Sequence, residues 1–264
     1  MKRACGSCSE FTNPACADLW KTRNVLPNSS ETFGRADDGS VVRVLFPDDS
    51  LIATQLEFIW PPLGLSRHET APSPPVLDLS VSNDIDRCRS TLALFAAERL
   101  SHHVAVHAGL IVVNDMAIVL PGPSMSGKST LCEAAGQIGL RVLSDEYALL
   151  RDDGRVEGWP RPIRLRTAEG TWKEGGTPVN DSQPYPVGLV ATLTYLAGQQ
   201  GLDIGRCSPG EAVMDLLANT ICAQSRPNQA FNAAVTLARS CSAVRGIRGE
   251  ADEAVVAILE FLRV

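Results

Sequence analysis

The feature that most constrains the fold of this chain is a glycine motif at residues 122–130, which read Gly-Pro-Ser-Met-Ser-Gly-Lys-Ser-Thr. Two glycines separated by four residues, then lysine and serine, match the pattern of a phosphate-binding loop, which needs a strand before it and a helix after it. Residues 116–120 form a short apolar run that ends at Pro121, and residues 131–138 favour a helix and contain no proline. The sequence therefore predicts a strand, a glycine loop and a helix in this order.

Each residue type in the motif has a physical role in holding phosphate. Glycines let the backbone N–H groups turn inward around an anion, and the N-terminus of the following helix adds partial positive charge. We expect Lys128 to reach the β- and γ-phosphates of a nucleotide, and the Ser129 hydroxyl to bind Mg2+. The residues predicted to contact the nucleotide here are Gly122, Ser124, Met125, Ser126, Gly127, Lys128, Ser129 and Thr130. The alternative is an ordinary glycine turn with a chance lysine, but pattern and context together favour a nucleoside triphosphate site.

Composition and charge exclude several classes of protein. A chain of 264 residues can form one large domain, or one domain and a smaller one, and 44% hydrophobic residues is typical of globular proteins. A net charge of −6 gives no support for nucleic-acid binding, which favours a basic face. No apolar run reaches the length of a membrane span, and the first residues lack the apolar core of a secretory signal. We therefore expect a cytoplasmic protein with no membrane or nucleic-acid partner.

The eight cysteines are scattered through a chain that is too large to need disulfides for stability, so we expect reduced thiols. Cys5, Cys8 and Cys16 leave a zinc site open as an alternative. A structural zinc normally has four ligands, however, and no histidine or cysteine follows these three before His68. We interpret the N-terminal cysteines as free thiols in a loose segment.

The sequence divides into three regions. Residues 1–40 lack periodicity and predict a weakly ordered lead-in, residues 41–83 predict a small β-rich region, and residues 84–264 predict the nucleotide-binding domain. Within the β-rich region, the expected strands are residues 41–46, 51–60 and 76–81, because these runs are rich in apolar and aromatic residues.

In the larger region, residues 84–102 predict an amphipathic helix, and residues 103–120 predict a hairpin that turns at Asn114-Asp115. The further strands expected are residues 140–143, 147–150 and 187–196, with a loop over 172–186. Ser208, Pro209 and Glu211 form a helix-start signature, and the helices expected there are residues 208–224, 230–239 and 252–264.

A second chemical signal is the acidic pair Asp145-Glu146, which follows an apolar strand 17 residues after Lys128. Many phosphate-loop proteins hold Mg2+ with an aspartate at such a strand end, beside the loop. A carboxylate in this position can also accept the proton of a hydroxyl that attacks phosphate. The short spacing favours a compact kinase, and the alternative is an exposed acidic turn without a catalytic role.

Together these residues resemble the HPr kinase/phosphorylase family and its diverged relatives. The similarity rests on His107-Ala108, the motif at 122–130 and residues 143–146, and it covers roughly residues 100–264. Residues 160–164 look like a segment of the diverged relatives, which include kinases of lasso-peptide pathways. The resemblance implies an α/β fold (α+β overall), with a P-loop core similar to the HPr kinase C-terminal domain and to phosphoenolpyruvate carboxykinase, preceded by the β-rich region.

The resemblance also implies roles for individual residues. Lys128 and Ser129 would hold phosphate and Mg2+, Asp145 matches the family's general base, Glu146 stands where the family has a second aspartate near the metal, and His107 matches a histidine close to the transferred phosphate. Three departures are the glutamate at 146, Ala108 in place of glycine, and the lack of the glycine-rich loop used for phosphorolysis. We therefore expect phosphorylation without the reverse reaction. From sequence alone, His107 could equally be a structural residue of its strand.

Three arginines at residues 161, 164 and 166 form an unusual basic segment. Guanidinium groups match phosphate oxygens, so Arg161 and Arg164 are candidates for binding phosphate or an acidic acceptor. Alternation places Arg164 and Arg166 on one face of a strand. The other interpretation is a solvated edge strand, which charges protect from unwanted pairing.

The function expected from these observations is transfer of the γ-phosphate of ATP, with Mg2+, to a hydroxyl of a small protein or peptide, with serine favoured as the acceptor. Two alternatives stay open: a kinase of a free small molecule, and a nucleotide-dependent switch or NTPase in which Glu146 activates water. The sequence does not identify the acceptor. HPr kinases form hexamers, but the partial match leaves the oligomeric state open, a homo-oligomer included.

Overall fold

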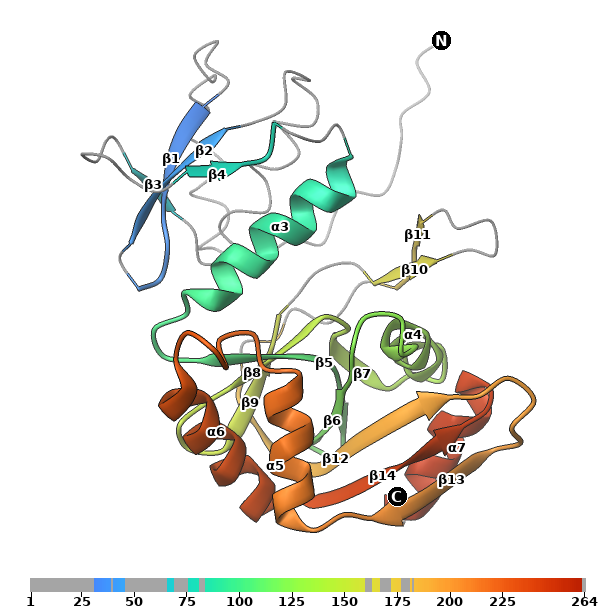
Figure 1. Ribbon diagram of the computed structural model, residues 1–264. Coiled ribbons are helices and arrows are strands. Elements are labelled where there is room, and N and C mark those ends of the chain that lie inside the picture. Colours follow the sequence, from blue (N-terminus) through green and yellow to red (C-terminus); the bar gives the residue numbers. More distant parts are fainter. Residues whose placement is uncertain are drawn as a thin grey trace, which may run out of the picture.

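The computed structural model describes residues 31–38, 40–45, 66–68, 76–80, 84–159, 163–166, 172–176, 181 and 183–262. They form a mixed α/β structure with a large sheet, a smaller four-stranded sheet and, in this described part, five helices (Figure 1). The small sheet contains β1 (Glu31–Arg35), β2 (Val41–Leu45), β3 (Ser66–His68) and β4 (Val76–Asp78), in the order β3-β1-β2-β4.

The large sheet has the strand order β13-β14-β12-β6-β5-β8-β9, and β7 also pairs with β5. Its strands are β5 (Val104–Val113), β6 (Met116–Pro121), β7 (Arg141–Ser144), β8 (Tyr147–Leu150), β9 (Arg155–Gly158), β12 (Tyr185–Tyr195), β13 (Leu202–Arg206) and β14 (Ser242–Arg248). A separate hairpin joins β10 (Arg164–Arg166) and β11 (Trp172–Glu174). The helices are α3 (Ile85–Glu98), α4 (Lys128–Gln137), α5 (Pro209–Ala218), α6 (Pro227–Ser240) and α7 (Ala251–Leu262).

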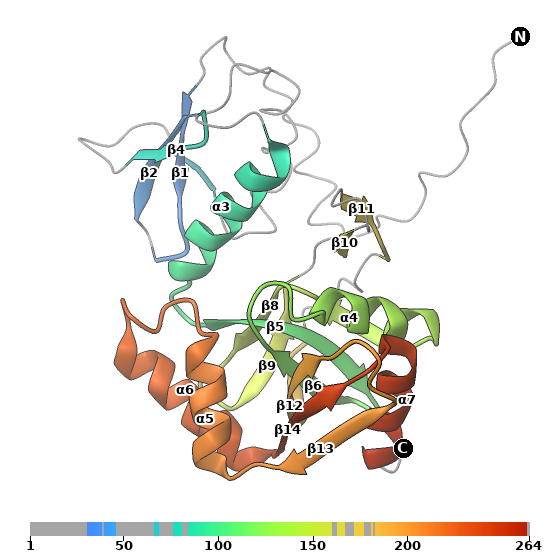
Figure 2. The ribbon, with the colours of Figure 1, turned by 45° about the vertical axis from the view of Figure 1, so that its right-hand side comes forward.

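Helices cover the large sheet on both faces. Alternate residues of β5, among them Val106 and Leu110, join a cluster with α5 and α6, whereas Ile111 and Val113 join a cluster with α4 and α7. Figures 1 and 2 show these two helix pairs on opposite sides of the sheet. A strand that is buried on both faces is expected to be continuously apolar, and β5 is apolar at nearly every position.

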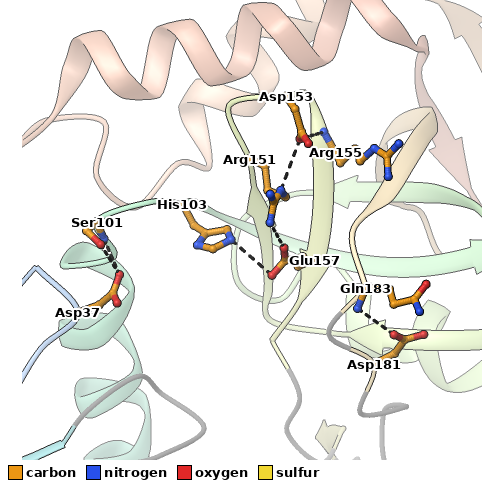
Figure 3. Close-up of polar contacts among 9 residues, drawn as sticks. All are labelled: Asp37, Ser101, His103, Arg151, Asp153, Arg155, Glu157, Asp181 and Gln183. Carbon is orange, nitrogen blue, oxygen red and sulfur yellow. Dashed lines mark hydrogen bonds and ion pairs between the residues drawn. The ribbon is translucent and has the colours of Figure 1, made fainter.

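The N-terminal sheet meets the rest of the molecule through α3. Leu92 and other apolar residues of this helix pack in one cluster with Val44 of β2, with Tyr147 of β8 and with Trp159, which follows β9. Asp37, in the turn after β1, accepts hydrogen bonds from the backbone and hydroxyl of Ser101 at 2.7 Å each (Figure 3). The turn is thereby attached to the connection between α3 and β5.

The hairpin of β5 and β6 confirms the sequence prediction, and its turn explains why. Asn114 and Asp115 have φ values of 48° and 58°, as a type I′ turn requires, and these residue types tolerate that conformation. The capping box at Ser208 and Glu211 is also confirmed: the Ser208 hydroxyl accepts from the Glu211 N–H, and the Glu211 carboxylate accepts from the Ser208 N–H at 2.8 Å.

Other expectations are wrong in part. The strand β1 lies within the segment 1–40, where the sequence predicts none, and β11 lies in the region predicted as a loop. The helix that begins after Ser208 ends at Ala218 rather than near residue 224. A strand, β14, separates the last two helices, and β9 and β13 were not predicted. The strand expected at 51–60 and the cysteines at 5, 8 and 16 lie outside the described residues.

The five described cysteines, Cys88, Cys132, Cys207, Cys222 and Cys241, are free thiols. Among the helices that the structure describes, none combines the length and the apolar character needed to cross a membrane.

Candidate functional site

The glycine loop and the acidic pair leave the same edge of the large sheet. Both β6 and β7 run antiparallel to β5, where Pro121 lies opposite Ala108 and Ser144 lies opposite Leu110. The Gly122 N–H donates to the carbonyl of His107 at 3.2 Å, and the Ala108 N–H donates to the carbonyl of Glu146 at 3.0 Å. Adjacent residues of β5 therefore hold both segments by their backbones.

The glycine loop has the conformation that its sequence allows. Gly127, the residue before α4, has φ 86°, and Met125 has φ 72°. Gly122 has no room for a side chain, because a Cβ there would lie 2.7 Å from the Ser126 hydroxyl oxygen. Gly122 and Ser126 thus shape the loop, whose exposed tip carries Met125.

Lys128, the first residue of α4, lies beneath this loop with a 7% exposed side chain. Its Nζ donates to the carbonyls of Gly122 and Pro123 at 2.8 Å each. Burial lowers the pKa of Lys128 to about 8, although the nearby carboxylates of Asp145 and Glu146 act in the opposite direction. The ammonium group is therefore close to its acidic neighbours and only partly stabilised by them.

The acidic pair sits in a tight turn between β7 and β8. The Ser144 hydroxyl accepts hydrogen bonds from the N–H groups of Glu146 at 3.2 Å and Tyr147 at 3.1 Å, which fixes the turn. Asp145 is 3% exposed, whereas Glu146 is half-buried. From α4, the Cys132 thiol donates to the Ser144 carbonyl at 3.5 Å, and burial raises the pKa of that thiol, so Cys132 acts as an apolar support.

His107 lies opposite Tyr147 in the pairing of β5 with β8. It is half-buried, and its ring centroid is 6.1 Å from that of Tyr147. The predicted histidine is therefore at the same sheet edge as the loop and the acidic turn.

A cavity of about 500 Å3 brings these residues together. Its walls include His107, Asp145 and Glu146, and from the loop and α4 they include Ser124, Met125, Gly127, Lys128, Ser129 and Thr130. Gly122 and Ser126 belong to the loop but do not line the cavity. Residues that the sequence singles out in three separate segments therefore line one cavity in the structure.

The basic segment is only partly described. Arg161 lies outside the described residues, and Arg164 lies in β10 with its backbone paired to Glu174, while its side chain is not described. Leu165, next to it, lines the cavity, and Ile163 is buried against the cluster of α4 and α7. Leu165 also packs against this cluster, and binding by Arg164 stays a prediction.

One wall of the cavity was not predicted from the sequence. Asp84, Asp86, Arg87 and Ser90, at the start of α3, line it opposite the loop. The Asp84 carboxylate caps the helix by accepting from the N–H groups of Asp86 and Arg87 at 2.9 and 3.4 Å. The sequence shows that these polar residues are spaced along one face of a helix. It does not show that this face lies near the glycine loop, which is nearly 40 residues away.

A second missed residue is Arg248, at the end of β14. Its side chain is 2% exposed, and its Nη2 donates to the carbonyl of Gly127 at 3.1 Å. No local signal marks an arginine as buried, since most are exposed.

Comparisons with known proteins give no family for this chain. The sequence matches no protein-family model, and the comparison with curated proteins gives no match.

Proposed function

We propose that this protein is a kinase that transfers the γ-phosphate of ATP to a hydroxyl group, with a serine of a small protein or peptide as the favoured acceptor. The observation that carries the proposal is that a glycine loop with a buried lysine and an acidic turn share one cavity with His107. These are the groups that phosphoryl transfer needs, because its catalysis consists of positioning and charge stabilisation.

The phosphate side of the cavity would be the loop and the start of α4. A P-loop nucleotide-binding core is supported by the order β6, glycine loop and α4, with Gly127 in the left-handed conformation at the helix N-terminus. Lys128 donates to two loop carbonyls, and an ammonium group held there can bind phosphate oxygens that enter the loop. The volume of about 500 Å3 lies within the range of roughly 300–1,000 Å3 for small-ligand sites.

The acceptor side would be the acidic turn. In the transfer, the acceptor oxygen forms a bond to the γ-phosphorus, the bond from that phosphorus to the β-phosphate oxygen breaks, and ADP leaves. The hydroxyl proton passes to the Asp145 carboxylate, which is buried and faces the same cavity as Lys128. His107 would lie near the transferred group, and the wall from α3 would bound the space for the acceptor.

The residues present fit a magnesium ion carried in with the nucleotide. Ser129, Asp145 and Glu146 line one cavity and offer a hydroxyl and two carboxylates. Mg2+ commonly takes one or two protein ligands together with phosphates and waters, so it needs no larger protein cage, and the described residues contain no group of three or more His, Cys, Asp or Glu placed to hold a metal. When bound, the ion would neutralise charge on the phosphates.

The HPr kinase-like resemblance supports the same assignment, because its three motifs, His107-Ala108, the glycine loop and the Asp145-Glu146 turn, meet at one edge of the sheet. We therefore propose that the protein acts as these kinases do, in the cytoplasm, on a small protein or peptide.

The test compares Asp145→Asn with Asp152→Asn, which changes an exposed carboxylate in the turn between β8 and β9. We expect Asp145→Asn to lower transfer by at least about a hundredfold while ATP binding, measured by calorimetry, stays within a few-fold of the unsubstituted protein. Asp152→Asn should leave both unchanged. Full transfer activity in Asp145→Asn would refute the role of Asp145 as proton acceptor.

A further inference from the structure

Arg248 lies at the same sheet edge as the glycine loop, although it is more than a hundred residues away in sequence. The strand β14, which ends at Arg248, runs parallel to β12, and β12 runs parallel to β6, which leads into the loop. The carboxyl ends of these three strands therefore meet at one edge, as the strand arrangement in Figures 1 and 2 shows. The cavity lies at this edge, because the loop that follows β6 lines it.

The guanidinium of Arg248 holds the base of the loop. Its Nη2 donates to the Gly127 carbonyl at 3.1 Å, and its Nη1 donates to the Gly249 carbonyl at 2.8 Å. The Gly127 carbonyl also accepts the N–H of Leu131 at 3.1 Å, in the first turn of α4. On the other side, the guanidinium carbon lies 5.0 Å from the centre of the Tyr195 ring. The charge is thus fixed directly behind Gly127, the residue that precedes the phosphate-facing helix.

This charge has no ion-pair partner among the described residues, although its side chain is only 2% exposed. Its Nε is buried and lacks a hydrogen-bond partner in the same part of the chain. Burial lowers the pKa of Arg248, against the opposing effects of Tyr195 and Glu250. Proteins rarely bury a cation without an anion, because the desolvation is costly.

We propose that Arg248 is a positioning residue that places a positive charge behind the glycine loop, and that the anion balancing it is the phosphate chain of the nucleotide. The inference rests on the proposed function, since it assigns the phosphates to this loop. Arg248 does not line the cavity, so it acts through the Gly127 carbonyl and through its electric field rather than by contact with the phosphates.

The test separates charge from packing with two substitutions at one position. Arg248→Lys keeps the charge and loses the planar fork, and Arg248→Met keeps a similar reach and loses the charge. We expect Arg248→Met to weaken ATP binding by roughly tenfold, as one charge acting across protein at a moderate dielectric constant would do, and Arg248→Lys to stay within about threefold. The defect of Arg248→Met should shrink from ATP to ADP to AMP and vanish for adenosine. The matched control is Arg245→Met, which removes an exposed arginine of the same strand that pairs with Asp215 at 2.7 Å.

Other outcomes would overturn the inference. Equal ATP affinity in a folded Arg248→Met variant would show that the charge is irrelevant, and an equal loss for adenosine would show a distorted fold instead. If Arg248→Met does not fold, the Arg248→Lys variant still tests the inference. A tenfold or greater loss of ATP affinity in the folded lysine variant, which keeps the charge, would contradict a role of the charge. Tripolyphosphate serves as a second probe of the unsubstituted protein. If the protein binds tripolyphosphate and ATP but transfers no phosphate, only the proposed kinase activity is refuted. If it binds neither compound, both the kinase activity and the role of Arg248 are refuted.

Discussion

At the scale of single residues, the chemistry of the cavity centres on Lys128. The sequence was sufficient to mark this lysine and the acidic pair as candidate site residues, because residue type and spacing within short motifs point to them. It could not indicate that the ammonium group is buried, since burial depends on how β5 brings the loop and the acidic turn together. Arg248 was missed for the same reason: its contact with Gly127 joins residues 121 positions apart.

The lowered pKa of Lys128 predicts a pH dependence of nucleotide binding. Below about pH 8 the free lysine is charged, whereas above it the lysine must take up a proton before it can bind phosphate. We expect ATP affinity to be constant below pH 8 and to fall by up to tenfold per pH unit above it, and Lys128→Arg to remove this fall. Calorimetry from pH 6 to pH 9.5 measures the ATP affinity. An affinity that does not change with pH in the unsubstituted protein would contradict the assignment of Lys128 to phosphate binding.

The same shift has a consequence for stability without ligand. Because the pKa of Lys128 is about 8 in the folded protein and near 10.5 in the unfolded chain, the unfolded chain binds more protons between these values. The contribution of Lys128 to the free energy of unfolding therefore rises with pH across this window. Measuring the free energy of unfolding against pH for the unsubstituted protein and for Lys128→Met isolates this contribution, which is the difference between the two profiles.

Two glycines with the same backbone conformation give a matched pair of substitutions. Gly127 and Gly139, at the two ends of α4, both have φ 86°, but a Cβ at Gly127 would collide with the Arg248 guanidinium, whereas Gly139 has open space. We expect Gly139→Ala to lower the free energy of unfolding by about 1–2 kcal/mol, the cost of a left-handed alanine. Gly127→Ala should cost more and also abolish ATP binding. Equal denaturation midpoints for the two variants would contradict the contact with Arg248.

At the scale of elements, the sequence predicted best where one local rule decides the structure. The hairpin of β5 and β6 follows from the Asn114-Asp115 turn, and α5 starts where the capping box requires. The strand β14 was missed because Arg245, Gly246 and Arg248 interrupt its apolar residues between two helices. Its strand conformation depends on pairing with β12 and β13, which local sequence cannot reveal.

The Glu133 side chain of α4 forms a hydrogen bond to the chain just after β11. The Glu133 carboxylate accepts from the Gly176 N–H at 2.8 Å, and the Ile163 N–H donates to the Gly176 carbonyl at 3.0 Å. We expect Glu133→Ala to speed hydrogen exchange of the Gly176 amide by about tenfold, because an acceptor is lost. Glu133→Gln, which keeps an acceptor oxygen, should retain most of the protection. Unchanged exchange in Glu133→Ala would show that this contact does not hold the hairpin.

At the scale of the whole molecule, the helix α3 joins the two regions into which the sequence divides at residue 84, because its apolar side chains share one cluster with Val44 and Leu79. The helix α3 carries one wall of the cavity and packs against both the small sheet and residues of β5 and β8 in the large one. The division at residue 84 is therefore a boundary in composition, while the apolar cluster of α3 continues across it.

Leu92 and Leu94 of α3 provide a direct test of this coupling. Leu92 is fully buried in that cluster, and Leu94 is 43% exposed. We expect Leu92→Ala to lower the free energy of unfolding by about 2–5 kcal/mol and to weaken ATP binding, because the wall of the cavity loosens. Leu94→Ala should change stability by less than about 0.5 kcal/mol. Urea denaturation and calorimetry measure both effects, and equal losses in the two variants would argue against the described packing of α3.

Phosphate transfer in the cavity is tested most directly by following the label of γ-labelled ATP, with Mg2+ and serine-containing peptides, over time. We predict that label appears on a serine hydroxyl, and that Lys128→Ala and Asp145→Asn each abolish this transfer. Release of label only as free phosphate, unaffected by Asp145→Asn and lost in Glu146→Gln, would contradict the kinase and identify a hydrolase.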